Sequence, residues 1–579
     1  MITAKGLCLT GTALAAMLAL ASPASARAVN PTRISRVSLT SLPQPLDDGV
    51  REKLTFTVCG GSGRLIVRVN RVVGLSRFQV RGCRERALSW EAPASAGVGY
   101  RVSVRAKIGR RPWSRTVSVS VGAVPDAGPG NVAVWLTTAG LREALSPMSP
   151  VSFTPLDPAI PTIQVSDATR YQRIIGFGAA MTDTSAWLLY DESPPSVRAL
   201  AMAALFGPSG IGLNYVRVPI GASDFTATGV PYTYDDVPAG DADPSLGQFS
   251  IAHDEAYILP ALRMMLALDP TVEILASPWS APAWMKANDA LDDLGYAGVL
   301  EPQNFDAYAD YLIAFIRAYA QAGVPIAAIT PENEAHTAAM YPSMDLDEDG
   351  FLTQNLVPTL RAAGLSTKVY GLDGSGLQYA EGMLSDPTVS SAIAGIAWHC
   401  YAGLEQMSEL QAIDPSASMI MSECSPGATA YPTAETVIAS LRNDAQAVDL
   451  WNLALDPADG PKQQAPGCDH CTGLVTVGEK SAGASLNLNY FQLGQVSKFV
   501  QRGAVRIGSD RWVSDFVGAD GSYGVTPGLD DVALENPNGS KVLVAYDNST
   551  QPIEFQVAWS GEAFTYTLAR GATVTFMWH

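Results

Sequence analysis

Two glutamates follow apolar, strand-like runs, where a pair of carboxyl groups can do acid and base chemistry. Glu334 ends the run 327–334, and Glu423 ends the run 419–423. Hydrolysis of a glycosidic bond needs a proton donor for the leaving oxygen and, in retaining enzymes, a carboxylate nucleophile about 5 Å away. Burial and mutual repulsion separate the pKa values of such a pair, so we expect Glu334 to stay protonated as the acid. A lone glutamate at a strand end is more often a solvated residue or an ion-pair partner.

Side chains that suit a sugar accompany these glutamates. The apolar faces of pyranose rings stack on Trp and Tyr, while their hydroxyls seek charged donors and acceptors. The candidate stacking residues are Trp279, Trp284, Tyr401 and Trp451. Asp183 is a candidate acceptor for sugar hydroxyls, and Arg217 or His399 a candidate to hold the nucleophile charged and oriented. Each has a structural alternative: a core position for a Trp, and a buried ion pair for Arg217.

The elements that carry these residues alternate between strand-like and helix-like segments. The strand-like runs are 173–178, 213–220, 273–279, 327–334, 368–375, 396–401, 418–425 and 448–454, with helix-like stretches such as 305–322 between them. Eight strands alternating with helices over about 300 residues predict an α/β fold, a (β/α)8 TIM barrel whose reactive groups collect where the strands end. Glu334 and Glu423 would then face each other across the barrel mouth.

All-β regions flank this predicted barrel, which we place at 171–500. Short alternating segments over 27–125 predict a separate β-sandwich, and the stretch 100–121, with Trp113 between two alternating runs, resembles the end of a fibronectin type III domain. Strand-like runs at 126–170 and 501–579 are expected to form the two parts of one β-sandwich side domain.

The first 26 residues have the pattern of a secretory signal. Lys5 precedes the apolar run 7–20, and Ala24-Ser25-Ala26 is a small-residue cleavage site. The run is shorter than the roughly 20 apolar residues that span a bilayer. We therefore expect a secreted protein, cleaved after Ala26, with no transmembrane segment in the mature chain.

Charge is distributed unevenly along the chain. The net charge of −18 argues against a nucleic-acid or anionic-membrane binder, since the summed field repels polyanions. Residues 27–125, however, hold 18 basic residues against 5 acidic ones. This basic domain would adhere to an anionic cell envelope or acidic polysaccharide, or dock on the acidic remainder of its own chain.

Six cysteines follow the predicted signal, an even number that suggests pairing in an exported protein. Cys59 with Cys83 and Cys468 with Cys471 are the disulfide candidates. A metal or redox site at 468–471 is the alternative, but the chain offers no second ligand pair near it.

Several motifs together resemble glycoside hydrolase family 30, the glucosylceramidase-like family. They occur in the family's order over 130–579, at 176–183, 215–225, 277–286, 330–334, 398–401, 422–424, 451–455 and 496–500. The resemblance implies a barrel with a β side domain and retaining hydrolysis of β-glycosides without a metal or other cofactor. It implies glucosylceramide, β-1,6-glucan or short β-glucosides as substrates, ahead of xylosidase or galactanase activity. A non-catalytic carbohydrate-binding or adhesion protein on the same scaffold is the alternative from another class.

The resemblance also assigns residues. By the matching motifs, Glu334 is the acid/base and Glu423 the nucleophile. Asn333 would bind the 2-hydroxyl of the sugar, and Asp183, Trp279 and Trp451 would form the rest of the sugar pocket. His399 and Tyr401 would support the nucleophile.

The sequence departs from the family pattern at two places. Ala335-His336 follows Glu334 where the family usually has Pro, which would alter the loop on the leaving-group side. Cys400 replaces a common Trp, and strand alternation points it and Cys424 away from the pocket, either as a disulfide or as buried thiols.

Overall fold

The computed structural model describes residues 130–579 except 426–431, 464–467, 469, 479–482 and the side chains and most of the backbone of 511–527. Before residue 130 it describes the backbone of one antiparallel sheet, formed by β1 (Arg36–Ser41), β2 (Arg51–Val69), β3 (Val72–Glu91), β4 (Gly99–Ile108) and β5 (Arg111–Ser120). In its register Cys59 lies opposite Cys83. The predicted signal lies outside the described residues. The fibronectin III-like sandwich at 27–125 and the Cys59–Cys83 bond depend on side chains that are also outside them, so all three stay predictions.

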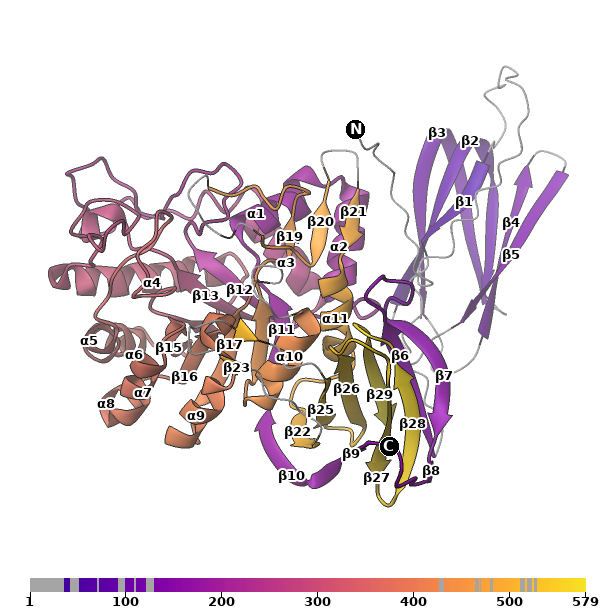
Figure 1. The fold of residues 1–579 in the computed structure, drawn as a ribbon. Helices are drawn as coiled ribbons and strands as arrows, with labels where there is room; N and C mark the ends of the chain where they lie inside the picture. The colour runs from indigo at the N-terminus through magenta and orange to yellow at the C-terminus, as the bar shows by residue number, and fades with distance from the viewer. Residues whose placement is uncertain are drawn as a thin grey trace, which may run out of the picture.

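Eight parallel strands close into a barrel, which confirms the predicted fold (Figure 1). They are β11 (Gly176–Ala179), β12 (Tyr215–Ile220), β13 (Glu273–Pro278), β14 (Ala328–Ile329), β15 (Lys368–Gly374), β16 (Gly395–His399), β17 (Ser418–Glu423) and β18 (Ala447–Leu450). β14 is much shorter than the run 327–334 that suggested it, because Pro331 has no N–H to continue the ladder. The chain from Thr330 to Glu334 therefore reaches the mouth as irregular backbone.

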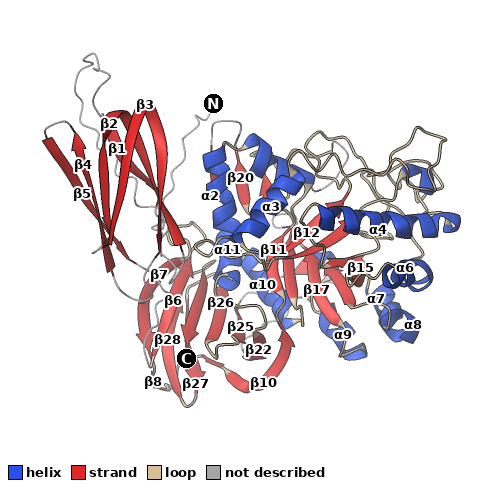
Figure 2. Ribbon diagram, turned by 180° about the vertical axis from the view of Figure 1, so that it is seen from behind, coloured by secondary structure: helices blue, strands red, loops and turns tan. Residues whose placement is uncertain are grey.

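Helices follow each barrel strand and cover the outside of the barrel (Figure 2). They are α1 (Asp183–Ala186), α2 (Pro195–Phe206), α3 (Ile258–Leu268), α4 (Phe305–Gln321), α5 (Glu348–Phe351), α6 (Val357–Ala362), α7 (Leu377–Ser385), α8 (Pro387–Ser390), α9 (Gln406–Ile413), α10 (Thr433–Arg442) and α11 (Leu488–Ser497). Segments of π-helix, Trp187–Glu192 and Leu352–Leu356, continue α1 and α5. In the described part of the chain no helix has the length and apolarity needed to cross a membrane.

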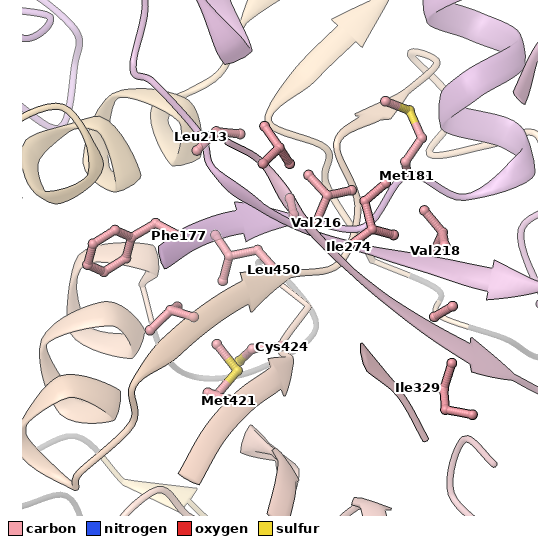
Figure 3. Packing of buried hydrophobic residues seen from close by; sticks show 14 of the residues in the cluster. Phe177, Met181, Leu213, Val216, Val218, Ile274, Ile329, Met421, Cys424 and Leu450 are labelled. Atoms are coloured by element: carbon pink, nitrogen blue, oxygen red, sulfur yellow. The ribbon is translucent and has the colours of Figure 1, made fainter. Parts of the chain in front are cut away.

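Alternation along the barrel strands separates the core from the site. Val216 and Val218 of β12 pack outward with Ile274 of β13 in the cluster beneath the helices (Figure 3). Arg217, between the two valines, is fully buried inside the barrel. Because strand side chains alternate in direction, one apolar strand both anchors the helices and carries a charge inward.

The side domain is built from both ends of the region after residue 130. Its larger sheet has the order β10 (Ser166–Arg173), β22 (Val505–Gly508), β25 (Leu529–Glu535), β26 (Lys541–Asp547), β29 (Thr573–Trp578), β6 (Asn131–Thr137) and β7 (Ser146–Ser152). Its smaller sheet has the order β8 (Thr154–Pro155), β28 (Glu562–Leu568), β27 (Ile553–Trp559) and β9 (Thr162–Gln164). Two further small sheets complete the described strands. One has the order β19 (Ala454–Leu455), β20 (Val475–Val477) and β21 (Ala484–Leu486), and the other pairs β23 (Phe516–Val517) with β24 (Tyr523–Gly524).

Strand β6 of the larger sheet is apolar on both faces, because each face packs against another layer. On β6, Val132 and Val134 enter the core between the two sheets, whereas Ala133 and Trp135 join the core of the barrel. The ring centroid of Trp135 lies 4.5 Å from that of Phe499, which follows α11. The first strand after residue 130 thus attaches the side domain to the barrel.

We expect Trp135→Ala to lower the free energy of unfolding by about 3–5 kcal/mol, because it leaves a cavity at this junction. Leu156→Ala is the control, since Leu156 is 40% exposed and its truncation opens no cavity. Urea unfolding followed by fluorescence and circular dichroism measures both variants. Equal, small losses in the two would contradict the assigned role of Trp135.

Candidate active site

Glu334 and Glu423 meet at the barrel mouth. One carboxylate oxygen of each and a ring nitrogen of His399 all lie within 4.8 Å of one another. The carboxyl groups of retaining glycosidases are about 5–5.5 Å apart, whereas inverting enzymes need about 6.5–9.5 Å to admit a water between them. The pair therefore has the spacing for direct attack on a sugar.

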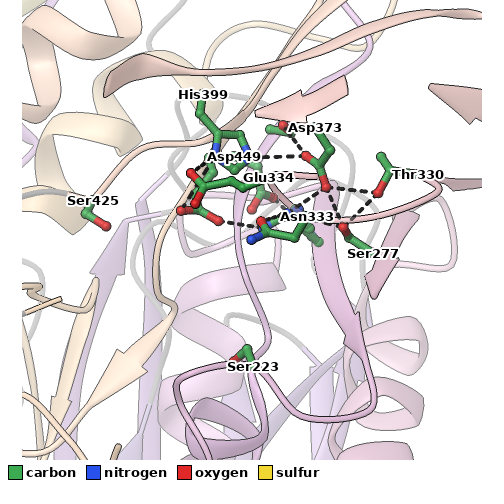
Figure 4. Close-up of polar contacts among 12 residues, drawn as sticks. Ser223, Ser277, Thr330, Asn333, Glu334, Asp373, His399, Ser425 and Asp449 are labelled. Atoms are coloured by element: carbon green, nitrogen blue, oxygen red, sulfur yellow. Dashed lines mark hydrogen bonds and ion pairs between the residues drawn. The ribbon is translucent and has the colours of Figure 1, made fainter. Parts of the chain in front are cut away.

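Figure 4 shows Asn333, Asp373 and His399 gathered around Glu334. Arg217 ties the nucleophile to its neighbours from inside the barrel. Its Nη1 donates to Glu423 Oε2 at 2.7 Å, and its Nη2 donates to Asp373 Oδ2 at 2.6 Å and to Asn333 Oδ1 at 2.7 Å. Burial alone would lower the pKa of Arg217, but the charges of Asp373 and Glu423 raise it further above its usual value. Arg217 thus stays a cation that fixes one oxygen of Glu423.

Asp373, at the end of β15, is the second centre of the network. Its carboxylate accepts hydrogen bonds from Ser277, from Thr330 at 2.9 Å and from Ser422 at 2.7 Å. Burial alone would raise the pKa of Asp373, but Arg217 and His399 hold it well below its usual range. Asp373 is therefore a permanent anion beneath the mouth.

His399 lies between this anion and the acid. Its Nε2 is 3.2 Å from Asp373 Oδ1, and its Nδ1 is 2.9 Å from Glu334 Oε1 but 3.9 Å from Glu423 Oε1. Burial alone would lower the pKa of His399, yet the charge of Glu423 and the hydrogen bonds to Asp373 and Glu334 raise it to about 10. The imidazolium can donate from both nitrogens, so His399 orients Glu334 more directly than Glu423.

Tyr401 completes the hold on the nucleophile. Its hydroxyl donates to Glu423 Oε1 at 2.9 Å and lies 2.9 Å from Ser425 Oγ. Burial raises the pKa of Tyr401 well above its usual value, so the hydroxyl keeps its proton. Each oxygen of Glu423 accordingly has one donor, Arg217 on one side and Tyr401 on the other.

A pocket of about 300 Å³ opens over the two glutamates. Trp279 and Trp451 stack in its wall with ring centroids 5.2 Å apart. Trp284, a further stacking candidate, instead donates its indole N–H to Asp235 at 3.0 Å and does not line the pocket. The lining residues are Asp224, Trp279, Asn333, Glu334, Tyr341, Tyr401, Glu423, Ser425, Trp451 and Cys468.

Asp183 lies behind the pocket wall. Its Oδ1 accepts from the backbone N–H of Ala227 at 2.6 Å, and its Oδ2 lies within 3.1 Å of Tyr232, His253 and Tyr257. These partners lie on the segment between β12 and α3, so Asp183 holds that segment in place by hydrogen bonds.

Asp224, a residue that the sequence reasoning did not single out, lines the pocket at the start of the same segment. Burial, and then the negative charge of Glu423, raise the pKa of Asp224 to about 7. The motif 223–225 contains this aspartate, but the sequence alone does not show that Asp224, and not Asp183, lines the pocket.

Disulfides lie on both sides of the pocket wall. Cys400 and Cys424 are bonded to each other, with Cα atoms 5.3 Å apart, and both are buried on the helix side of the barrel. Cys468 and Cys471 are bonded within their short loop, and Cys468 lines the pocket. The Cys468–Cys471 disulfide therefore forms part of the pocket wall.

Comparison with known proteins gives the family. Residues 174–470 match the glycosyl hydrolase family 30 TIM-barrel domain, and residues 503–576 match the glycosyl hydrolase family 30 beta sandwich domain. The chain belongs to glycosyl hydrolase family 30. It is thus a glycoside hydrolase, as the paired glutamates predicted, and the family's β-sandwich domain confirms the side domain.

Relatives within family 30 cover most of the chain. An endo-1,6-beta-D-glucanase of Neurospora crassa is 34% identical over 72% of this chain and 87% of its own length. The lysosomal acid glucosylceramidase of Mus musculus is 27% identical over 71% of this chain and 82% of its own. Among solved structures, the endo-beta1,6-glucanase BT3312 matches with a TM-score of 0.67 and 27% identity, over 77% of this chain and 99% of its own.

We expect Asp183→Ala and Asp224→Ala to lower kcat/KM for a β-glucoside at least tenfold for different reasons. Loss of Asp224 removes a polar group from the pocket, whereas loss of Asp183 leaves several half-buried donors without their acceptor, each worth up to about 1–3 kcal/mol. Only Asp183→Ala should therefore also lower the melting temperature by several degrees. Full activity of Asp224→Ala would show that this carboxyl does not touch the sugar.

The pKa of His399 predicts a pH dependence of stability. A histidine whose pKa rises on folding stabilises the protein fully below its unfolded pKa of about 6.5 and loses this contribution as pH rises through the folded pKa. We expect the difference in melting temperature between wild type and His399→Gln to shrink between pH 6.5 and about 10. A difference that stays constant over that range would show that the imidazole is not charged in the folded protein.

Proposed function

We propose that the protein is an exported retaining hydrolase of β-1,6-linked glucan. The observation that carries the proposal is the short separation of Glu334 and Glu423. One oxygen of each lies within 4.8 Å of the other, in a pocket lined by Trp279 and Trp451. The linkage is inferred from the relatives, because endo-1,6-beta-D-glucanases of Neurospora crassa and Trichoderma harzianum are 34% and 32% identical to the chain, against 27% for the mouse glucosylceramidase.

The geometry supports a double displacement. Glu423, oriented by Arg217 and Tyr401, attacks the anomeric carbon while Glu334 gives its proton to the departing oxygen. This forms a glycosyl ester on Glu423 and releases the leaving sugar. Glu334 then takes a proton from water, the water oxygen attacks the anomeric carbon, and Glu423 leaves as a free carboxylate.

Asn333 has a defined part in both steps. Its Oδ1 accepts from Arg217, so its amide N–H groups are the atoms that can donate to a sugar hydroxyl in the pocket. A hydrogen bond to the 2-hydroxyl that strengthens in the transition state contributes several kcal/mol in such enzymes.

Export is inferred from the signal-like residues 1–26. The basic segment 27–125 would then hold the enzyme on an anionic surface such as a cell envelope, or rest on the acidic remainder of the chain.

We expect wild type to release sugar from a chromogenic β-glucoside and from β-1,6-linked gluco-oligosaccharides, with the β-anomer as first product by NMR. Glu423→Gln should abolish both reactions. Glu334→Gln should lower kcat/KM about 10²–10⁴-fold for the oligosaccharides but spare kcat/KM for substrates with good leaving groups, whose first step needs no proton. Their kcat should still fall, because the second step needs Glu334 as a base.

The matched control is Glu554→Gln, an exposed glutamate of β27, which should behave as wild type. Glucosylceramide in detergent is the competing substrate. Preference for it would overturn the proposed linkage, an α-anomer as first product would overturn the retaining mechanism, and a folded wild type inactive on every β-glycoside would support a binding protein.

A further inference from the structure

Two stacked rings lie on the rim beside the acid, outside the residues that line the pocket. His336 is two residues beyond Glu334, and its ring lies over that of Tyr379 with centroids 4.0 Å apart. Tyr379 is 41% exposed, and the side chain of His336 is 30% exposed. An exposed aromatic pair at the mouth of a sugar-cleaving site offers a surface on which a sugar ring can stack.

The backbone places this pair next to Glu334. A Cβ added to Gly374, at the end of β15, would lie 3.4 Å from the Cα of Glu334, so the two segments are in contact. Two residues on, Gly376 lies beside Tyr379, where an added Cβ would be 2.7 Å from Cδ2 at the edge of the ring. The pair therefore joins the segments after β14 and β15 on the acid's side of the mouth.

A carboxylate accompanies the rings. Asp345 Oδ1 is 3.4 Å from His336 Nδ1, and the side chain of Asp345 is 40% exposed. A flat apolar face with a solvent-facing carboxylate beside it matches a hexopyranose, which offers one apolar face and a rim of hydroxyls.

We propose that His336, Tyr379 and Asp345 form the subsite for the sugar on the leaving-group side. The ligand is a neutral hexopyranosyl unit of a β-glucan, and the inference rests on the proposed function. Glu334 protonates the departing oxygen, so the sugar attached to that oxygen must lie on the side of Glu334, away from the wall of Trp279 and Trp451. Ala335, which separates Glu334 from His336, stands where the family usually continues with Pro.

The test compares a substrate that fills this subsite with one that leaves it empty. A β-1,6-linked glucotriose places a sugar there, whereas β-D-glucosyl fluoride has only fluoride as leaving group. We expect Tyr379→Ala to lower kcat/KM about tenfold for the trisaccharide, the size of one lost stacking contact, and less than twofold for the fluoride. Tyr379→Trp should restore the trisaccharide rate, and Asp345→Asn should lower it.

The matched control is Tyr171→Ala, because Tyr171 is an equally exposed tyrosine (46%) on β10 of the side domain. Melting temperatures within about two degrees of wild type exclude a folding effect. Equal losses on both substrates, or no loss on the trisaccharide, would overturn the subsite and leave the proposed function standing. A wild type that hydrolyses the fluoride but not the trisaccharide would overturn the proposed linkage and the subsite together.

Discussion

The arrangement of the active site depends on the pairing of one buried cation, Arg217. A guanidinium without solvent is tolerated only when anions and hydrogen-bond acceptors surround it, and removing one partner of such a group costs about 3–5 kcal/mol. Asp373 supplies the permanent charge, while Glu423 and Asn333 are held because they accept hydrogen bonds from the two terminal nitrogens. The contacts that neutralise Arg217 therefore also position the nucleophile Glu423 and the amide of Asn333.

Charge balance explains which groups around the nucleophile ionise. Arg217 and His399 offset Asp373 and Glu423, so further anions are disfavoured: burial raises the pKa of Asp449 well above its usual value, and burial with Glu423 raises that of Asp224 to about 7. When Glu423 becomes an ester its charge disappears. One cause of the raised pKa of Asp224 is then removed, so this pKa falls.

The barrel and the catalytic pair were predictable because both follow from local patterns. Apolar runs of strand length that alternate with helices imply parallel strands. The polar residues at the ends of these runs then gather at one edge of the barrel. The choice of Asp224 over Asp183 was not predictable, because both follow barrel strands. What distinguishes Asp183 is its set of partners on the segment before α3, up to Tyr257, 74 residues away along the chain. The length of β14 was overestimated because the apolar run in the sequence continues through Pro331. The strand's regular hydrogen bonds to its neighbours do not continue there.

The interruption at Pro331 produces an asymmetry between the two glutamates that matches their roles. Glu423 ends a regular strand, has a donor on each oxygen and is 9% exposed in its side chain, which suits a nucleophile that must keep one orientation. Glu334 lies on irregular backbone with φ of 57°, a left-handed conformation that a non-glycine residue adopts at a cost of about 1–3 kcal/mol, and its side chain is 18% exposed. An acid that later takes a proton from water must be reachable by water. The strained, more open backbone gives Glu334 that access, and a continuous strand at β14 would have removed it.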